Sequence, residues 1–174
     1  MTVAKKKRTP NQRHYSASEW AEAEVDSFLE GEAQESDLDW HTLTDNVELT
    51  EELETAQGNF TEESVRVVEA WVEKNPELAI GLQKSDWLDS DDHIAYGAWS
   101  HRQGSGVGFW EEMTGDEYRS LLKALNDDKK WTSAGVEIES EIYNVAGEAV
   151  EKTKRESNLP PSTAIRQLKN KLLR

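Results

Sequence analysis

The sequence contains no cysteine, and this absence excludes disulfide bonds, thiolate zinc sites and cysteine nucleophiles. Long apolar runs are also absent, since none approaches the roughly 18 residues of a membrane-spanning helix. The first residues, MTVAKKKRT, lack the apolar segment of a signal peptide. We therefore expect a soluble protein that works in a reducing compartment, the cytoplasm, and has no membrane partner.

Basic residues are missing from one long part of the chain. Residues 14–65 contain sixteen Asp and Glu and neither Lys nor Arg, within a sequence whose net charge is −15. Both ends have the opposite composition, because residues 1–13 contain five bases and no acid, and the last 27 residues contain seven bases against three acids. We expect a basic, disordered arm over residues 1–13, an acidic domain over 14–156 and a basic C-terminal helix over 157–174.

The length and the aromatic content predict a folded domain. A chain of 174 residues suffices for one domain of ordinary size, and its seven tryptophans argue against disorder, since disordered chains are poor in aromatic residues. Capping residues and apolar spacing predict a mainly α-helical, single compact domain of about six helices with a glycine-rich loop. The expected helices lie near residues 16–29, 61–75, 76–82, 90–103, 114–126, 131–157 and 162–172, with a short one at 50–56 inside a loop.

The run after Trp131 fits two kinds of structure. Val136 and Ile138 alternate as in a strand, whereas Ile138, Ile142 and Val145 are spaced as on one face of a helix. The length of the run without an internal turn favours the helix. A short β element near residues 136–145 is the alternative.

Residues 89–110 combine two tryptophans, two histidines and four glycines, of which three stand at the alternate positions 104, 106 and 108. Apolar residues at 94, 95, 98 and 99 fall on one face of a helix that the glycines end, and the aromatic residues at 109 and 110 are expected to return onto that helix. We therefore expect three tryptophans to be mostly buried, namely Trp71, Trp99 and Trp110. Trp20 and Trp131 are expected to be partly exposed.

The same segment contains three weak patterns for chemistry. The glycines at 104, 106 and 108 do not form a dinucleotide fingerprint, which needs a preceding strand and different spacing. The acids at 89, 91 and 92 beside His93 are better explained by the first turn of a helix than by a metal site. Ser105 near His101 lacks an orienting acid. We expect no metal, no cofactor and no enzymatic activity, and an enzyme that uses residues 89–110 is the least favoured hypothesis.

Four carboxylates form a stripe on the first expected helix. Glu19, Glu22, Asp26 and Glu30 follow one another at spacings of three and four residues, which places them roughly 5–6 Å apart along the helix. This spacing is comparable to the phosphate repeat of a nucleic-acid strand, as a DNA mimic requires. It is also typical of any solvated acidic helix. We select these four residues as the candidate partner-binding site, with a basic host protein or a nucleic-acid-binding protein as the partner.

Residues 98–111, AWSHRQGSGVGFWE, resemble a motif of small bacteriophage accessory proteins, RNGHGxGFWD in its usual form. Gln103, Ser105 and Glu111 replace its Asn, His and Asp, and the similarity covers about 50 residues. The resemblance implies an accessory role for a phage protein and a short aromatic strand at 142–145. We also select five residues of this glycine loop as a candidate loop site, namely Arg102, Gly104, Gly106, Gly108 and Trp110.

These observations support three hypotheses. The first is an acidic, phage-type interaction protein or inhibitor that occupies a host protein's basic or nucleic-acid-binding surface. The second is a nucleic-acid-associated accessory protein that binds through its basic ends, with Lys5, Lys6, Lys7 and Arg8 as the contact residues. The third is the small enzyme above. The basic ends have a simpler interpretation as well, in which they neutralise the acidic face of their own chain or of a neighbouring subunit.

Overall fold

The computed structural model describes residues 19–104 and 108–157, and these residues contain seven α-helices, two 3-10 helices and no strand. The α-helices are α1 (Trp20–Ser36), α2 (Trp40–Asp45), α3 (Glu51–Lys74), α4 (Ile80–Lys84), α5 (Asp91–Arg102), α6 (Gly115–Asn126) and α7 (Lys129–Ser157). The 3-10 helices are η2 (Asp86–Leu88) and η3 (Phe109–Glu112). The mainly α-helical architecture is confirmed. The arm at 1–13 and the helix expected at 162–172 lie outside the described residues.

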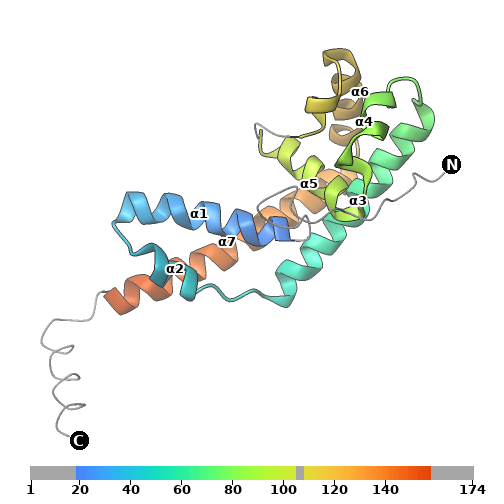
Figure 1. The fold of residues 1–174 in the computed structure, drawn as a ribbon. Coiled ribbons are helices and arrows are strands. Elements are labelled where there is room, and N and C mark those ends of the chain that lie inside the picture. The colour runs from blue at the N-terminus through green and yellow to red at the C-terminus, as the bar shows by residue number, and fades with distance from the viewer. Residues whose placement is uncertain (1–18, 105–107, 158–174) are drawn as a thin grey trace, which may run out of the picture.

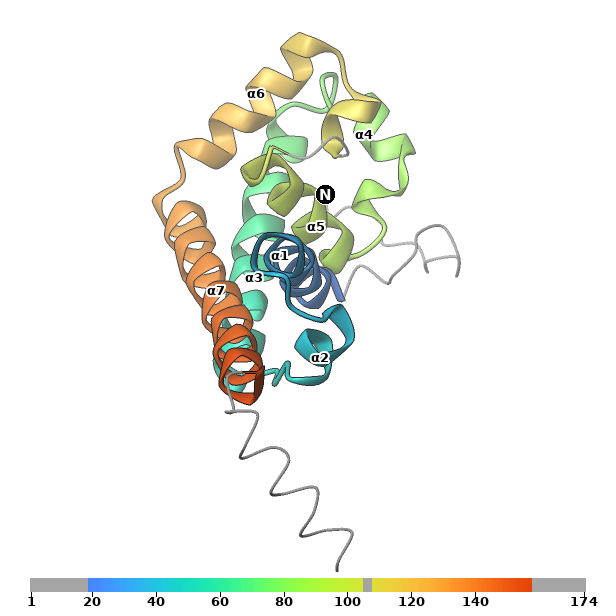
Figure 2. The same cartoon turned by 90° about the vertical axis from the view of Figure 1, so that its left-hand side faces the viewer.

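Helix α3 is the central element of the fold (Figure 1). It packs against α7, α5 and α6, while α1 lies along α7 and α2 joins α1 to the start of α3. Figure 2 shows α1 beside α7 and near the first part of α3, with α4 and α6 at the other end of the molecule. The two longest helices, α3 and α7, therefore connect two ends of one domain.

Capping side chains fix the starts of α2, α3, α5 and α6. Thr50 accepts a hydrogen bond from the backbone N–H of Leu53 at the start of α3, and Ser90 accepts one from His93 at the start of α5. Thr114 and Glu117 form a capping box at the start of α6, where the sequence predicted a helix near residues 114–126. The expected helix start at Thr61 is wrong, because α3 runs unbroken from Glu51 to Lys74. The N-terminal half of α3 buries Ala56 and Phe60 in the core. This packing stabilises the helix upstream of Thr61.

Helix α7 covers the whole of residues 136–145, so the β element considered for this segment is wrong. Ile138, Ile142 and Val145 are buried, whereas Val136 is 57% exposed. Burial therefore follows the helical period and not the alternation of a strand. The strand implied at 142–145 by the resemblance to phage proteins is corrected by the same observation.

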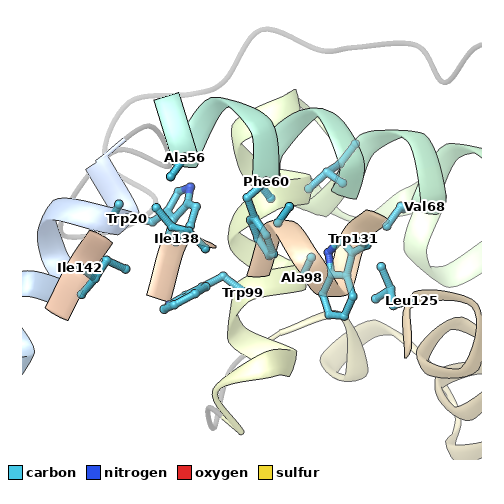
Figure 3. Packing of buried hydrophobic residues seen from close by; sticks show 14 of the residues in the cluster. Trp20, Ala56, Phe60, Val68, Ala98, Trp99, Leu125, Trp131, Ile138 and Ile142 are labelled. Carbon is cyan, nitrogen blue, oxygen red and sulfur yellow. The ribbon is translucent and has the colours of Figure 1, made fainter. Parts of the chain in front are cut away.

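An aromatic cluster forms the centre of the core (Figure 3). The ring of Trp20 lies 5.0 Å from that of Trp99, and the ring of Phe60 lies 5.9 Å from Trp99 and 5.7 Å from Trp131, measured between centroids. These four side chains come from α1, α5, α3 and α7, so a single cluster joins the four helices. These close contacts, two of them tilted and that of Phe60 with Trp99 edge to face, add specific ring-to-ring attraction to the burial of apolar area.

The structure confirms two of the five burial predictions for tryptophan and corrects three. Trp71 and Trp99 are buried as expected. Trp20 and Trp131, expected to be partly exposed, are 0% and 1% exposed because α1 and α7 direct them into the aromatic cluster. Trp110, expected to be buried, is 45% exposed, because its neighbour in η3 takes the position against α5.

Candidate functional site

The acidic stripe of α1 lies at the surface, as its helical spacing predicted. Glu19, Glu22 and Glu30 are exposed, and Asp26 is half-buried at the edge of the face that α1 turns to the core. Burial raises the pKa of Asp26 above its ordinary value, because desolvation disfavours its charged form. Three of the four predicted carboxylates are therefore exposed at the surface.

Two members of this stripe also line a surface groove of about 380 Å³. The groove lies where α1, α3 and α5 meet, and we call it the acidic groove. Four carboxylates line it, those of Glu19, Glu22, Glu54 and Asp92, and none of its lining residues in the described part of the chain is Lys or Arg. The tertiary structure thus gathers acids from three helices at one place.

Three helix N-termini explain how so many like charges are accommodated there. Glu22 lies in the first turn of α1, Glu54 in the first turn of α3 and Asp92 in the first turn of α5. Each helix N-terminus carries a partial positive charge from its unpaired N–H groups, which stabilises a nearby carboxylate by roughly 0.3–1 kcal/mol. The three helix N-termini therefore offset part of the repulsion among the carboxylates of the acidic groove.

The acidic groove also has an apolar wall. Leu49 and Leu53 line it, and Leu49 is 49% exposed while Leu53 is 3% exposed. Lys and Arg side chains bind surfaces of this mixed kind well, because their aliphatic stems cover apolar atoms while their charged ends reach carboxylates. The lining is suited to basic side chains presented by another molecule.

The charge of the whole folded body has the same sign. The described residues contain all 35 acidic residues but 11 of the 20 basic ones, so their formal charge is −24. Arg66 is the first base after residues 14–65, the stretch that contains acids but neither Lys nor Arg. It forms ion pairs with Glu63 at 2.7 Å and with Asp128 at 2.6 Å. This contact lowers the pKa of Asp128. The remaining nine bases, including Lys5, Lys6, Lys7 and Arg8, lie outside the described residues.

Sequence reasoning identified Glu19 and Glu22 but missed Glu54 and Asp92 as their neighbours. Asp92 was assigned to the start of a helix, which is correct, and Glu54 to a short helix in a loop. Both carry a signal, because acids in a first helical turn mark an N-terminus. The convergence of three N-termini depends on how the helices pack, which the sequence pattern does not contain.

The predicted loop site is occupied in large part by packing contacts. Arg102 ends α5 and donates from Nε to Glu139 of α7 at 2.7 Å, and Gln103 donates to the same carboxylate at 3.0 Å. A Cβ at Gly135 would stand 2.7 Å from Arg102 Nε, so the glycine leaves the space in which the guanidinium lies. The Arg102 side chain therefore connects α5 to α7.

The glycines and aromatic residues of the loop have different roles. Gly104 has φ +66°, a left-handed conformation that ends α5 and favours glycine. Gly108 is buried, and Phe109, 1% exposed, packs on Gly97 of α5. Trp110 lies at the surface beside Gly108, and Gly106 lies outside the described residues. Of the predicted loop site, Trp110 is the large side chain that a ligand in solution would contact.

The two histidines of residues 89–110 do not form an open site. His93 is 0% exposed. His101 is half-buried, with its Nε2 3.2 Å from Asn126 Oδ1 and its ring stacked on that of Trp131. Burial lowers the pKa of His101 below its ordinary value. Ser105 lies outside the described residues.

Within residues 19–104 and 108–157, no group of three or more His, Asp and Glu side chains is arranged to hold a metal ion. None of the helices in that part of the chain combines the length and the apolar character needed to cross a bilayer.

Comparison of the chain with models of known protein families, with curated proteins and with solved structures finds no match.

Proposed function

We propose that this protein is an acidic interaction protein, of the phage accessory type, that binds and occupies a basic surface of a host protein in the cytoplasm. The observation that carries the proposal is the acidic groove, where carboxylates of α1, α3 and α5 surround an apolar wall. The partner's surface is one that otherwise binds nucleic acid, since such surfaces present rows of Lys and Arg. The protein acts by occupation and uses no catalytic group.

Electrostatics favour this function over the binding of nucleic acid through the basic ends. A body with a formal charge of −24 repels a phosphate backbone and attracts a basic protein surface. The attraction accelerates association and weakens as salt rises, because ions screen exposed charges beyond about 10 Å at 0.1 M. Relief of repulsion among the carboxylates adds to the affinity.

The test compares two variants with the same change of charge. The groove variant combines Glu19→Gln, Glu22→Gln and Glu54→Gln, and the control variant combines Glu77→Gln, Glu111→Gln and Glu112→Gln at exposed positions near α4 and η3. Proteins of a bacterial lysate that are retained on the immobilised wild-type chain are identified, purified and measured for affinity to each variant, with duplex DNA as a competitor.

The proposal expects the groove variant to bind the partner at least about tenfold more weakly, which corresponds to ~1.4 kcal/mol, and the control variant to change the affinity less than about twofold. Duplex DNA should compete with the protein for the partner. Equal losses in the two variants would show that net charge alone is responsible, and direct binding of duplex DNA by the wild-type chain would favour the second hypothesis.

A further inference from the structure

A second groove, of about 380 Å³, follows the contact between α1 and α7. Its apolar part is an aromatic pair: Phe28 of α1 is 36% exposed, Tyr143 of α7 is 55% exposed, and their rings meet edge to face at 5.3 Å. The same pair borders a smaller hollow of about 200 Å³ on its other side. Two large exposed aromatic side chains in contact are unusual on so polar a protein, and they indicate a surface that something covers.

The charge around this aromatic groove is negative. Glu32, Glu148 and Glu151 line it, and Lys154 lies at the end nearest to the C-terminus of α7. A segment that fits must therefore present apolar side chains to Phe28 and Tyr143 and basic side chains to the flanking carboxylates. Figures 1 and 2 show α1 and α7 side by side along this contact.

We propose that the chain's own C-terminal segment, residues 162–174, binds in this aromatic groove. The proposal is independent of the acidic groove and goes beyond the proposed function. Residues 158–174 lie outside the described part of the chain, and they follow directly on α7, which ends at Ser157. A tethered segment reaches a neighbouring groove at a high effective concentration, so even a modest intrinsic affinity keeps it bound.

The length of the segment matches the length of the groove. The groove extends from Tyr143 to Lys154 of α7, about 16 Å at 1.5 Å per residue. Residues 162–174 would span about 18 Å as a helix. Pro160 and Pro161 disfavour continuation of α7, so they favour a change of chain direction between α7 and this segment. A segment that turns back after Ser157 therefore covers the groove along its whole length.

The side chains of the segment match the groove as well. Ile165, Leu168 and Leu172 are spaced as one apolar stripe of a helix, and Arg166 and Lys169 flank that stripe. An antiparallel arrangement that begins at the turn brings Arg166 to the level of Glu151 and Lys169 to the level of Glu148. It brings Leu172 to the aromatic pair.

The absence of cysteine allows a direct test by crosslinking in the full-length chain. Gly147, in the groove, is replaced with Cys together with Asn170→Cys, and the control pair is Gly58→Cys with Asn170→Cys. A Cβ at either glycine meets no atom within 4 Å, so both substitutions fit the fold. Because Gly58 lines the acidic groove, the control also tests whether negative charge alone attracts residues 162–174.

The measurement is the rate of intramolecular crosslinking at low protein concentration, with a bis-maleimide whose arm spans about 8–10 Å, the usual separation of packed helix axes. The proposal expects the Gly147 pair to react at least about tenfold faster than the Gly58 pair. Equal rates would overturn it. Crosslinks that join two chains in place of one would also overturn it, because they would place the segment on a second copy.

A charge exchange identifies the contacts. Glu148→Lys with Glu151→Lys should slow crosslinking of the Gly147 pair about fivefold or more, because both flanking attractions become repulsions. Adding Arg166→Glu and Lys169→Glu should restore the rate, which a misfolded variant would not do. A rate that the first exchange leaves unchanged, or that the second leaves low, would overturn the proposed register. The groove variant of the proposed function should leave all these rates as they are, so the two proposals fail separately.

Discussion

The indole N–H of Trp131 donates a hydrogen bond to the hydroxyl of Ser64 at 2.9 Å, and both side chains are completely or almost completely buried. This bond joins α7 to α3, the two longest helices, next to the aromatic cluster. It also explains why a tryptophan can be buried here, since its polar atom has a partner.

Ser64→Ala should lower the free energy of unfolding by about 1–3 kcal/mol, because it leaves the indole N–H of Trp131 buried without an acceptor. Ser133→Ala, at an exposed position of α7, should change it by less than about 0.5 kcal/mol. Urea denaturation of the two variants measures the difference. Equal losses would show that the bond contributes nothing specific.

Gly97→Ala should destabilise the protein by about 1–3 kcal/mol. The ring of Phe109 lies on Gly97, and an added Cβ would stand 2.5 Å from its Cζ, so the ring must move out of its buried position. Gly58→Ala is the matched change in a helix, and it should stabilise the protein by about 0.5–1 kcal/mol because the position is open. Thermal unfolding of both variants checks this, and a gain at Gly97 would contradict the packing described here.

Trp99→Ala should remove about 3–5 kcal/mol of stability, a large part of that of a domain of this size, since Trp99 contacts the rings of Trp20 and Phe60. Trp110→Ala should remove less than about 1 kcal/mol, because that side chain is 45% exposed. Calorimetry on the two variants gives the comparison. An unchanged unfolding temperature for the first would disprove the aromatic core.

Acidification should destabilise the protein through His101. Burial lowers its pKa in the folded state, so the unfolded chain takes up the proton first, and stability falls as the pH drops below the unfolded value of about 6.5 until the folded pKa is reached. His101→Phe should flatten this part of the curve of stability against pH. His41→Gln, at an exposed position of α2, should leave it unchanged. Denaturation series between about pH 7 and 5 make the measurement. An equal slope in wild type and His101→Phe would refute the assignment.

Salt should stabilise the free protein. Repulsion within a body of charge −24 weakens as ions screen it, so the unfolding temperature should rise by about 2–6 °C between low and physiological ionic strength. The groove variant, which has three fewer carboxylates, should respond less to added salt than wild type does. A wild-type unfolding temperature that does not depend on salt would show that the carboxylates repel one another too weakly to favour a basic partner.

Much of the fold was predictable from local sequence, because it depends on local physics. Capping residues such as Ser90 and Thr114 accept hydrogen bonds from residues three positions away, and the apolar spacing of Ile138, Ile142 and Val145 reports a helical face wherever the helix lies. The exposed acidic stripe of α1 follows from the same period. The absence of bases from residues 14–65 determined that this part of the surface would be negative.

Which tryptophans are buried and which carboxylates meet at one groove depend on tertiary packing, which local sequence patterns do not report. Trp20 and Trp131 are buried because α1 and α7 bring them to Phe60 of α3, and Trp110 is exposed because Phe109 fills the space over Gly97. Glu54 and Asp92 join Glu19 and Glu22 because three helix N-termini meet at one groove. The helical period of the sequence indicates on which side of a helix each residue lies. Whether that residue is buried or joins a site depends on which other helix covers that side.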